Sequence, residues 1–255
     1  MNMRSLFCLC FILSLAISSL SLAQIKHSSE EQAFVAASGA YQDGFYTLAI
    51  DQLTDFLAQY PNGNFAATAA FLLGDSYFRL KEYARSIYHL EKLLTSSPAM
   101  QYRQQSQVRI GEAYFHLGQF NRSKEKLNQF VLSNTEGNLL DDAYYWLAES
   151  EYRLGQKNDA LRHYAELITL APQSDLADYA LYSIGFIYES EAQYSQAISA
   201  YKKMIKDYPD SKLYSAVVYR IGFAAISNCE YDLAIKLLSN ALEKFPNDKL
   251  SGRAE

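Results

Sequence analysis

The 255-residue sequence is poor in cysteine, proline and tryptophan, and the shortage of cysteine restricts the fold most directly. Two of its three cysteines, Cys8 and Cys10, lie in an apolar segment at the N-terminus. Once this segment is removed, Cys229 has no cysteine to pair with, so an internal disulfide is excluded. The fold must therefore be held together by packing alone.

The chain also lacks a cluster of basic residues. Its formal net charge is −5, and removal of the N-terminal segment with its single arginine, Arg4, brings this to −6. Proteins that bind nucleic acid use patches of lysine and arginine against the phosphates. The composition therefore argues against nucleic acid as a partner.

Patterns of catalytic or metal-binding residues are missing as well. No histidine lies at metal-ligand spacing from a cysteine or another histidine, and no glycine-rich phosphate loop is present. His89 and His163 share one register, which favours a recurrent surface position. Asp141 and Asp142 are expected near a helix start, where acidic side chains suit the helix dipole. We therefore expect no enzyme activity, no metal and no cofactor.

The first residues have the pattern of a secretory signal peptide. Arg4 precedes an apolar run over residues 6–17, and Ser21-Leu22-Ala23 offers small residues at the cleavage positions. We expect a signal peptide over residues 1–23 and a mature chain over residues 24–255. The alternative is an uncleaved anchor, but the serine-containing stretch 5–23 is marginal for a membrane span. The mature chain is expected to have no transmembrane span.

The few prolines reveal internal repeats. All five are spaced by multiples of 37 residues, and Thr135 occupies the one empty position: Pro61, Pro98, Pro172, Pro209 and Pro246. Two series of small residues keep the same period: Ala37, Gly74, Gly111, Ala148, Gly185 and Gly222, and Ala49, Ser86, Ser123, Ala160, Ala197 and Ala234. Three series in one register indicate a repeat of 37 residues.

Each repeat has the pattern of a helix–turn–helix. Apolar residues recur at helical spacing, as in Ala197-Ile198, Tyr201 and Met204-Ile205. The small residues predict close helix contacts, and the turns hold Gly44, Gly118 or Gly155, expected in the left-handed conformation. Cys229 stands in an equivalent turn, where an inert small residue is the simpler interpretation. Proline ends the second helix because it cannot continue it.

These features predict an all-α fold, a right-handed α–α superhelix of about six repeats. The expected repeats cover residues 29–61, 62–98, 99–135, 136–172, 173–209 and 210–246. Residues 247–255 match the start of a seventh repeat. We therefore expect either a longer array or a partner that covers this end.

The spacing of small residues and proline resembles the tetratricopeptide repeat (TPR) family. Gly74, Ser86 and Pro98 follow one another at intervals of 12, as that family's pattern requires. The 37-residue period and ends such as Tyr60-Pro61-Asn62-Gly63 are similar to a bacterial envelope subgroup. That subgroup includes the periplasmic coordinator of the Tol–Pal system and the lipoprotein of the outer-membrane barrel-assembly machine. The coiled coil of the former and the lipidated cysteine of the latter are absent here.

The resemblance implies a concave groove lined by the first helix of each repeat. On this basis the candidate peptide-binding or protein-binding residues are Phe71, Phe78, Arg79, Phe115, Tyr145, Glu149, Tyr152, Arg153, Tyr182 and Tyr219. Tyrosine and arginine are typical anchors of protein interfaces. The alternative for each ring is packing of one repeat on the next. The lysines and asparagines of the family's carboxylate clamp are absent.

The leading hypothesis is an exported, periplasmic or cell-envelope scaffold that binds a protein or peptide partner and catalyses nothing. One alternative is a structural spacer or regulatory N-terminal array of a longer protein whose binding domain follows residue 255. Another is an enzyme whose catalytic domain follows that residue. The sequence alone identifies neither the partner nor the oligomeric state.

Overall fold

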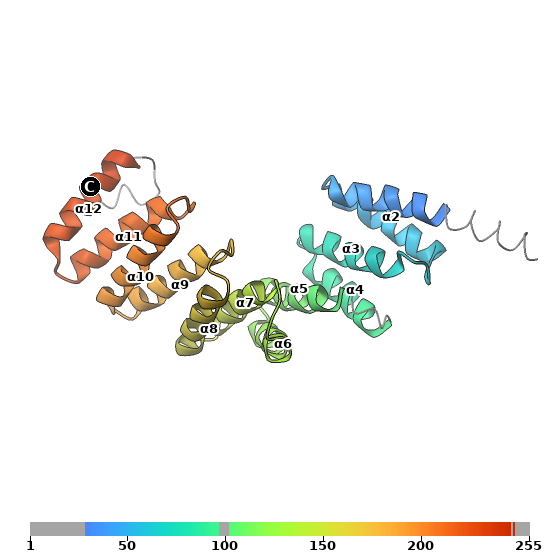
Figure 1. Cartoon of the computed structure of the whole chain (residues 1–255), viewed down its shortest axis with the longest axis horizontal. Coiled ribbons are helices and arrows are strands. Elements are labelled where there is room, and N and C mark those ends of the chain that lie inside the picture. Colours follow the sequence, from blue (N-terminus) through green and yellow to red (C-terminus); the bar gives the residue numbers. More distant parts are fainter. Residues whose placement is uncertain (1–28, 97–101, 246, 248–255) are drawn as a thin grey trace, which may run out of the picture. The chain divides into compact units, whose positions relative to one another are not determined.

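The computed structural model describes residues 29–96, 102–245 and 247, and every regular element within these ranges is an α-helix (Figure 1). Residues 29–42 are helical. Eleven helices of 14 residues follow: α2 (Tyr46–Gln59), α3 (Ala66–Arg79), α4 (Tyr83–Ser96), α5 (Arg103–His116), α6 (Phe120–Ser133), α7 (Leu140–Arg153), α8 (Lys157–Leu170), α9 (Ala177–Ser190), α10 (Tyr194–Asp207), α11 (Tyr214–Ser227) and α12 (Tyr231–Lys244). The prediction of an all-α repeat fold is confirmed. The expected signal peptide and all of the expected seventh repeat except Asn247 lie outside the described residues.

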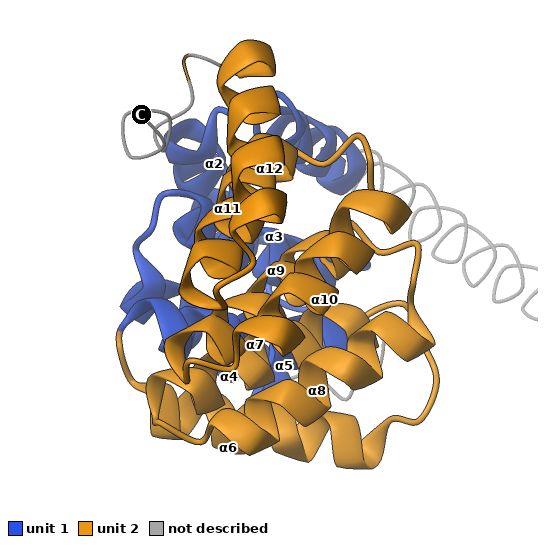
Figure 2. Ribbon diagram, turned by 90° about the vertical axis from the view of Figure 1, so that its left-hand side faces the viewer, with its two compact units in different colours: residues 1–117 blue, residues 118–255 orange. Residues whose placement is uncertain are grey.

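The chain divides into two compact units, residues 1–117 and 118–255 (Figure 2). Within each unit, helices that follow one another in the chain pack together. In unit 1, α3 pairs with α4; in unit 2, α7 pairs with α8, α9 with α10 and α11 with α12. A turn of a few residues joins the members of a pair, so each pair is an antiparallel helical hairpin.

The turn inside each hairpin uses the left-handed backbone conformation at one fixed position. The six residues there are 37 apart and have φ between 56° and 79°: Gly44, Lys81, Gly118, Gly155, Ala192 and Cys229. At the first, the N–H of Phe45 donates to the carbonyl of Ala40 (2.9 Å) and that of Gly44 to Tyr41 (3.0 Å). This is the Schellman pattern that ends helices with a left-handed residue. The expectation for the three glycines is confirmed, and Cys229 takes the same conformation although it has a side chain.

Ala192→Gly should raise the free energy of unfolding by about 0.5–1 kcal/mol. The left-handed conformation costs a residue with a side chain about 1–2 kcal/mol, and the larger entropy of unfolded glycine offsets part of that gain. Gly155→Ala, at the equivalent turn, should lower stability by a similar amount. Urea unfolding of both variants measures the effect, and a change of the same sign in both would contradict the assignment.

Glycines at the small-residue positions let the two helices of a hairpin approach closely. A Cβ atom added at Gly74 would lie 2.6 Å from Leu90 Cδ2, and one at Gly222 would lie 2.5 Å from Leu238 Cδ2. At Gly185 the added atom would overlap the ring of Tyr201. In each case the opposing side chain comes from the second helix, 16 residues later. The predicted close helix contact is therefore confirmed at these three positions.

Gly185→Phe should lower the free energy of unfolding by about 1–3 kcal/mol or more, because overpacking would force α9 and α10 apart. Gly39→Ala is the control, since an added Cβ there meets no atom within 4 Å. In a helix interior that change should stabilise by about 0.5–1 kcal/mol. Thermal unfolding of both variants tests the pair, and an unchanged melting temperature for Gly185→Phe would show that the contact is misplaced.

Candidate protein-binding surface

The first helices of the hairpins carry clusters of aromatic and charged side chains in both units. In unit 2 the cluster consists of Tyr152 on α7, Tyr182, Phe186 and Glu189 on α9, and Arg220 on α11, and we call it the aromatic–arginine cluster. All five side chains are half-buried. They come from three successive repeats, because a period of 37 brings first helices next to one another.

Arg220 is the centre of the aromatic–arginine cluster. Its guanidinium lies over the rings of Tyr182 (5.4 Å to the centroid) and Phe186 (5.0 Å). Its Nη1 donates to Glu189 Oε2 (3.0 Å), while its buried Nε has no hydrogen-bond partner. The side chain is 22% exposed. Arg220 is therefore a partly exposed arginine within cation–π distance of two aromatic rings.

The positions of Tyr182, Phe186 and Glu189 follow from helical spacing, since residues four and three apart lie on one face. Tyr182 and Phe186 stack with centroids 6.4 Å apart, and Tyr152 meets Phe186 edge-on at 6.2 Å. Behind them, Tyr201 donates its hydroxyl to Glu189 (2.8 Å). Burial and the Glu189 carboxylate raise the pKa of Tyr201, so this hydroxyl keeps its proton. The carboxylate thereby holds both Tyr201 and Arg220.

A second carboxylate, Glu149 on α7, organises the neighbouring part of unit 2. It accepts hydrogen bonds from the hydroxyls of Tyr164 (2.5 Å) and Ser183 (3.3 Å). Tyr145 lies against the buried ring of Tyr164 at 6.0 Å, and burial raises the pKa of Tyr145. Glu149 thus joins α7, α8 and α9 through its Oε1 atom.

Unit 1 contains a buried ion cluster on the corresponding helices. Asp75 on α3 is 1% exposed and accepts a hydrogen bond from the Tyr41 hydroxyl (2.5 Å). Arg79 Nε lies 3.1 Å from Oδ2 of Asp75. Arg109 Nε lies 2.8 Å from Oδ1 of Asp75, at an angle unsuited to a hydrogen bond. Two arginines compensate the buried charge, as a carboxylate in a low-dielectric site requires.

Arg109 also connects this ion cluster to the aromatic rings of unit 1. Its guanidinium lies 4.5 Å above the ring of Phe78, and its Nη1 donates to Glu112 (2.7 Å). Phe78 meets Tyr83 edge-on at 5.3 Å, and Tyr83 stacks on His116 at 4.8 Å. Unit 1 therefore repeats the arrangement of unit 2, with an arginine of a first helix over an aromatic ring of the preceding one.

The predicted site residues fall into three groups. Those in or beside the clusters are Phe78, Arg79, Tyr145, Glu149, Tyr152 and Tyr182. The second group lies outside the clusters and consists of Phe71, Phe115 and Arg153. Phe71 and Phe115 are half-buried, and Phe71 stacks on Tyr102 at 4.8 Å. Arg153 is exposed and lies over the ring of Phe120 at 5.8 Å. Tyr219 is 0% exposed and donates its hydroxyl to the carbonyl of Phe245 (3.2 Å). Tyr219 is therefore a core residue and offers no surface to a partner.

Sequence reasoning missed Arg109, Arg220, Phe186 and Glu189. A signal was present, since Arg109 and Arg220 are 111 residues apart, which is three periods of 37. Each arginine follows by one residue the repeat position that Tyr145 and Tyr182 occupy in their own repeats. Phe186 is one period after Glu149, at a position that is acidic in the three preceding repeats. Glu189 is one period after Tyr152.

The prediction of a recurrent surface histidine is wrong at His163. That side chain is 5% exposed, and its Nδ1 lies 2.6 Å from Oε2 of the buried Glu151. His89 is half-buried and stacks on Tyr77 at 5.0 Å. A shared register sets which helix face a residue takes, but the neighbouring Glu151 decides whether an imidazole can be buried there. Across the described ranges, no group of three histidine, cysteine, aspartate or glutamate side chains could hold a metal ion.

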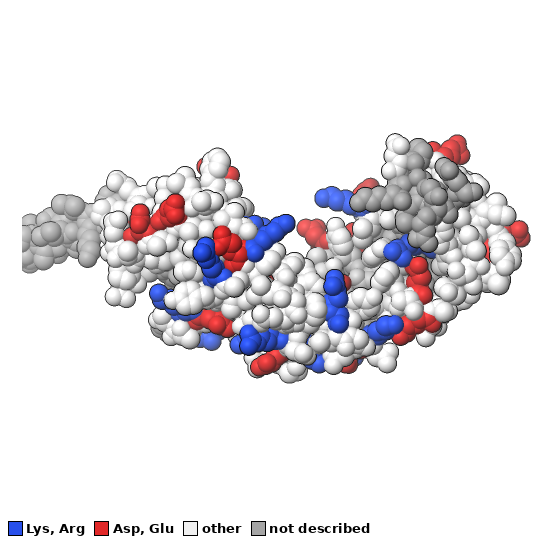
Figure 3. All heavy atoms as spheres, turned by 180° about the vertical axis from the view of Figure 1, so that it is seen from behind, with Lys and Arg blue, Asp and Glu red and all other residues white. Residues whose placement is uncertain are grey.

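Charge is mixed over the surface. Figure 3 shows basic and acidic side chains interspersed on the visible face of both units. This fits the absence of a basic cluster from the sequence. In the part of the chain that the structure describes, no helix has both the length and the apolar character needed to cross a membrane.

Comparisons with known proteins identify the repeat. Tetratricopeptide repeat profiles match residues 34–100 and, in a second profile, residues 105–134, 142–174 and 179–211. The chain belongs to the tetratricopeptide repeat family. No curated protein matches its sequence.

Solved TPR structures share the fold. The crystal structure of MamA is 26% identical, with a TM-score of 0.57 over 68% of this chain and 94% of its own. PilW, described as a type IV pilus biogenesis factor, is 14% identical, with a TM-score of 0.68 over 88% and 97%. YrrB, described as a TPR protein with an unusual peptide-binding site, is 16% identical, with a TM-score of 0.59 over 79% and 96%. TPR proteins bind protein or peptide partners, and this chain is a scaffold of that type.

The unit 1 ion cluster should make stability fall in alkali. Burial and Asp75 raise the pKa of Tyr41 to about 12, from about 10 in the unfolded chain. Below pH 10 both states keep the proton, so this contribution is constant. Between pH 10 and 12 only the unfolded state loses it, so the free energy of unfolding falls. The Tyr41→Phe variant should be less stable at pH 7, and its free energy of unfolding should fall less steeply between pH 10 and 12. Denaturant unfolding at each pH measures this, and an unchanged slope would contradict the assignment.

Proposed function

We propose that this TPR chain is an exported scaffold of the bacterial cell envelope that binds an extended or helical segment of a partner protein. The observation that carries the proposal is the aromatic–arginine cluster of unit 2. Its aromatic and arginine side chains are the types enriched at the energetic centres of protein interfaces. They are half-buried on the first helices, so part of each side chain remains at the surface.

The chemistry of the cluster indicates what the partner segment carries. Tyr152, Tyr182 and Phe186 offer apolar ring surface to apolar side chains. Arg220 can donate to a carboxylate or a backbone carbonyl of the partner from the guanidinium that now contacts Glu189. The segment therefore combines apolar side chains with acidic or neutral polar groups. Binding is expected to concentrate in a few of these anchors.

Export rests on the sequence of residues 1–23. The positive Arg4, the apolar run and the small residues before Gln24 have the order that signal peptidase requires. The 37-residue period and the Tyr-Pro repeat ends support membership of the envelope subgroup that includes the Tol–Pal coordinator and the barrel-assembly lipoprotein. N-terminal sequencing of protein secreted by a bacterial host should give Gln24, and intact Met1 on soluble cytoplasmic protein would contradict export.

The binding proposal is tested with Tyr182→Ala. This change removes the ring under Arg220, and partner affinity should weaken by about 1–3 kcal/mol, as expected for an interface anchor. The measurement is a quantitative pull-down from a bacterial envelope extract, followed by titration of the captured partner against wild-type and variant protein. Melting curves of both proteins are recorded in parallel.

Tyr219→Ala is the matched control, since it lies at the same position one repeat later but is buried. It should lower stability by about 3–5 kcal/mol, as for removal of a large core ring, while affinity per folded molecule stays unchanged. If Tyr182→Ala behaves in the same way, with a lower melting temperature and full affinity, these rings serve packing and the proposed site is wrong.

A further inference from the structure

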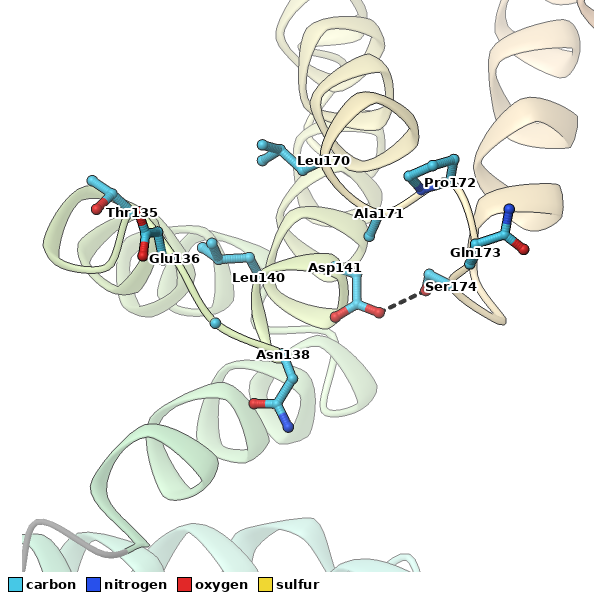
Figure 4. A pocket seen from close by; sticks show the side chains of 11 residues that line it. Thr135, Glu136, Asn138, Leu140, Asp141, Leu170, Ala171, Pro172, Gln173 and Ser174 are labelled. Carbon is cyan, nitrogen blue, oxygen red and sulfur yellow. Dashed lines mark hydrogen bonds between the residues drawn. The ribbon is translucent and has the colours of Figure 1, made fainter.

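Unit 2 contains a pocket that lies away from the aromatic–arginine cluster, where the loops between hairpins meet. It has a volume of about 550 Å³, within the ~300–1,000 Å³ typical of ligand sites. One wall is the loop 135–138 before α7, and the other is the end of α8 with the loop 171–174 (Figure 4). Leu140, Leu170 and Ala171 make much of its lining apolar.

The pocket coincides with a departure from the repeat pattern at Ala171. The residue before the proline position is aromatic in three repeats, as Tyr60, Tyr208 and Phe245. The remaining repeats have Ser97 and Asn134, and Asn134 turns its amide back to the carbonyl of Phe130 (2.8 Å). Ala171 alone combines the loss of the ring with an apolar side chain.

The backbone at Ala171 matches that at Tyr208, one repeat later. Ala171 has φ −135° and ψ 65°, and Tyr208 has φ −131° and ψ 65°. Both N–H groups donate to the carbonyl four residues earlier, at 2.8 and 2.9 Å. The Cα–Cβ bonds of the two residues therefore point the same way relative to their hairpins.

The loops that follow also match, atom for atom. Ser174 donates to Asp141 (2.6 Å) and accepts from the N–H of Leu176 (3.1 Å). One repeat later, Ser211 donates to Asp178 (2.5 Å) and accepts from the N–H of Leu213 (3.0 Å). The two sites are therefore built alike, apart from the side chain at the position of Ala171 and Tyr208 and the path of the preceding loop.

Tyr208 shows what fills the equivalent space. Its ring packs against the core clusters on either side of it, and its hydroxyl donates to the carbonyl of Pro172 in the preceding loop (2.8 Å). With Ala171 in its place, no aromatic ring among the described residues lines the space between loops 135–138 and 171–174. The chain therefore carries its own example of the group that fits: an aromatic ring with a polar end.

The rim of the pocket is also more apolar than the equivalent surface of the other repeats, which favours binding. Leu170 is 53% exposed, whereas the same position in the other repeats is polar: Gln59, Ser96, Ser133, Asp207 and Lys244. An exposed leucine beside a vacated ring position extends the apolar lining to the surface. Asp141 and the exposed Glu136 and Asn138 add polar groups along the edge.

From this geometry we propose that the pocket binds a tyrosine or phenylalanine side chain of a partner polypeptide, together with part of its flanking backbone. The partner ring takes the place that Tyr208 fills in the next repeat. Leu140 and Leu170 contact the ring, and the polar edge receives the hydroxyl or the partner's amide groups. This site is separate from the aromatic–arginine cluster, so either can fail without the other.

The test uses N-acetyl-tyrosinamide and N-acetyl-phenylalaninamide as probes, with N-acetyl-leucinamide for comparison. Backbone amide NMR shifts of the full chain are followed at Gly137, Leu170 and Ser174 during titration. Both aromatic probes should give saturable shifts at these residues, and the leucine probe should bind about tenfold more weakly, a difference of about 1.4 kcal/mol. Absence of saturable shifts, or equal binding of the leucine probe, would overturn the proposal.

Ala171→Tyr should close the site from within. It should abolish the probe shifts and raise the melting temperature, because the new ring fills the cavity as Tyr208 does. Persistence of the shifts, or loss of cooperative unfolding, would refute the equivalence of positions 171 and 208. Tyr182→Ala should leave probe binding intact, which separates this site from the proposed function.

Leu170→Asp gives this position the residue of the next repeat and should weaken probe binding by about tenfold at an unchanged melting temperature. Ile235→Asp is the matched control, since Ile235 is 65% exposed and does not line the pocket. It should leave probe binding unchanged. Equal loss in the two variants would mean that the probe binds through general surface hydrophobicity.

Discussion

The close contact between the two helices of a hairpin is the constraint on which the rest of the structure depends. Gly74, Gly185 and Gly222 each face an apolar side chain of the second helix at a distance that leaves no room for a Cβ atom. Dense packing of this kind gains dispersion energy over many atoms and tolerates little change in volume. It sets the spacing of the helices, and this spacing in turn brings equivalent residues of successive repeats into contact.

Equivalent tyrosines of successive repeats differ in exposure, because their neighbours on other helices differ. Tyr182 and Tyr219 occupy the same position in successive repeats, yet Tyr182 is half-buried and Tyr219 has no exposed surface. The residue opposite Gly185 is the large, fully buried Tyr201, whereas Leu238 lies opposite Gly222. Tyr201 contacts the ring of Tyr182 (6.1 Å between centroids), while Tyr219 lies in a buried cluster with Leu238 and donates its hydroxyl to the carbonyl of Phe245.

Polar contacts between repeats favour one relative placement of neighbouring helices around this apolar core. Carboxylates on first helices collect hydroxyls and arginines from neighbouring helices, as Asp75 does in unit 1 and Glu189 in unit 2. Buried charges contribute little net stability, but an unpaired one is costly, so these networks favour one relative placement of neighbouring helices. The same networks hold Arg109 and Arg220 over aromatic rings of the preceding first helix.

The 37-residue repeat is visible directly in the order of the amino acids. The series of prolines and small residues at a period of 37 established the helices, the left-handed turns at Gly44, Gly118 and Gly155, and the close contacts at Gly74, Gly185 and Gly222. These features depend on local backbone chemistry and on the period of the apolar pattern, which a sequence displays directly.

Which of the equivalent side chains in successive repeats are exposed became clear from the folded structure alone. The burial of Tyr219 and of His163, and the meeting of Arg220 with Tyr182 and Phe186, depend on volumes and charges contributed by other helices. The pocket beside Ala171 arises in the same way, since an alanine leaves a cavity only where the neighbouring elements do not collapse onto it. Such outcomes depend on several residues far apart in the chain, so no single position of the pattern could predict them.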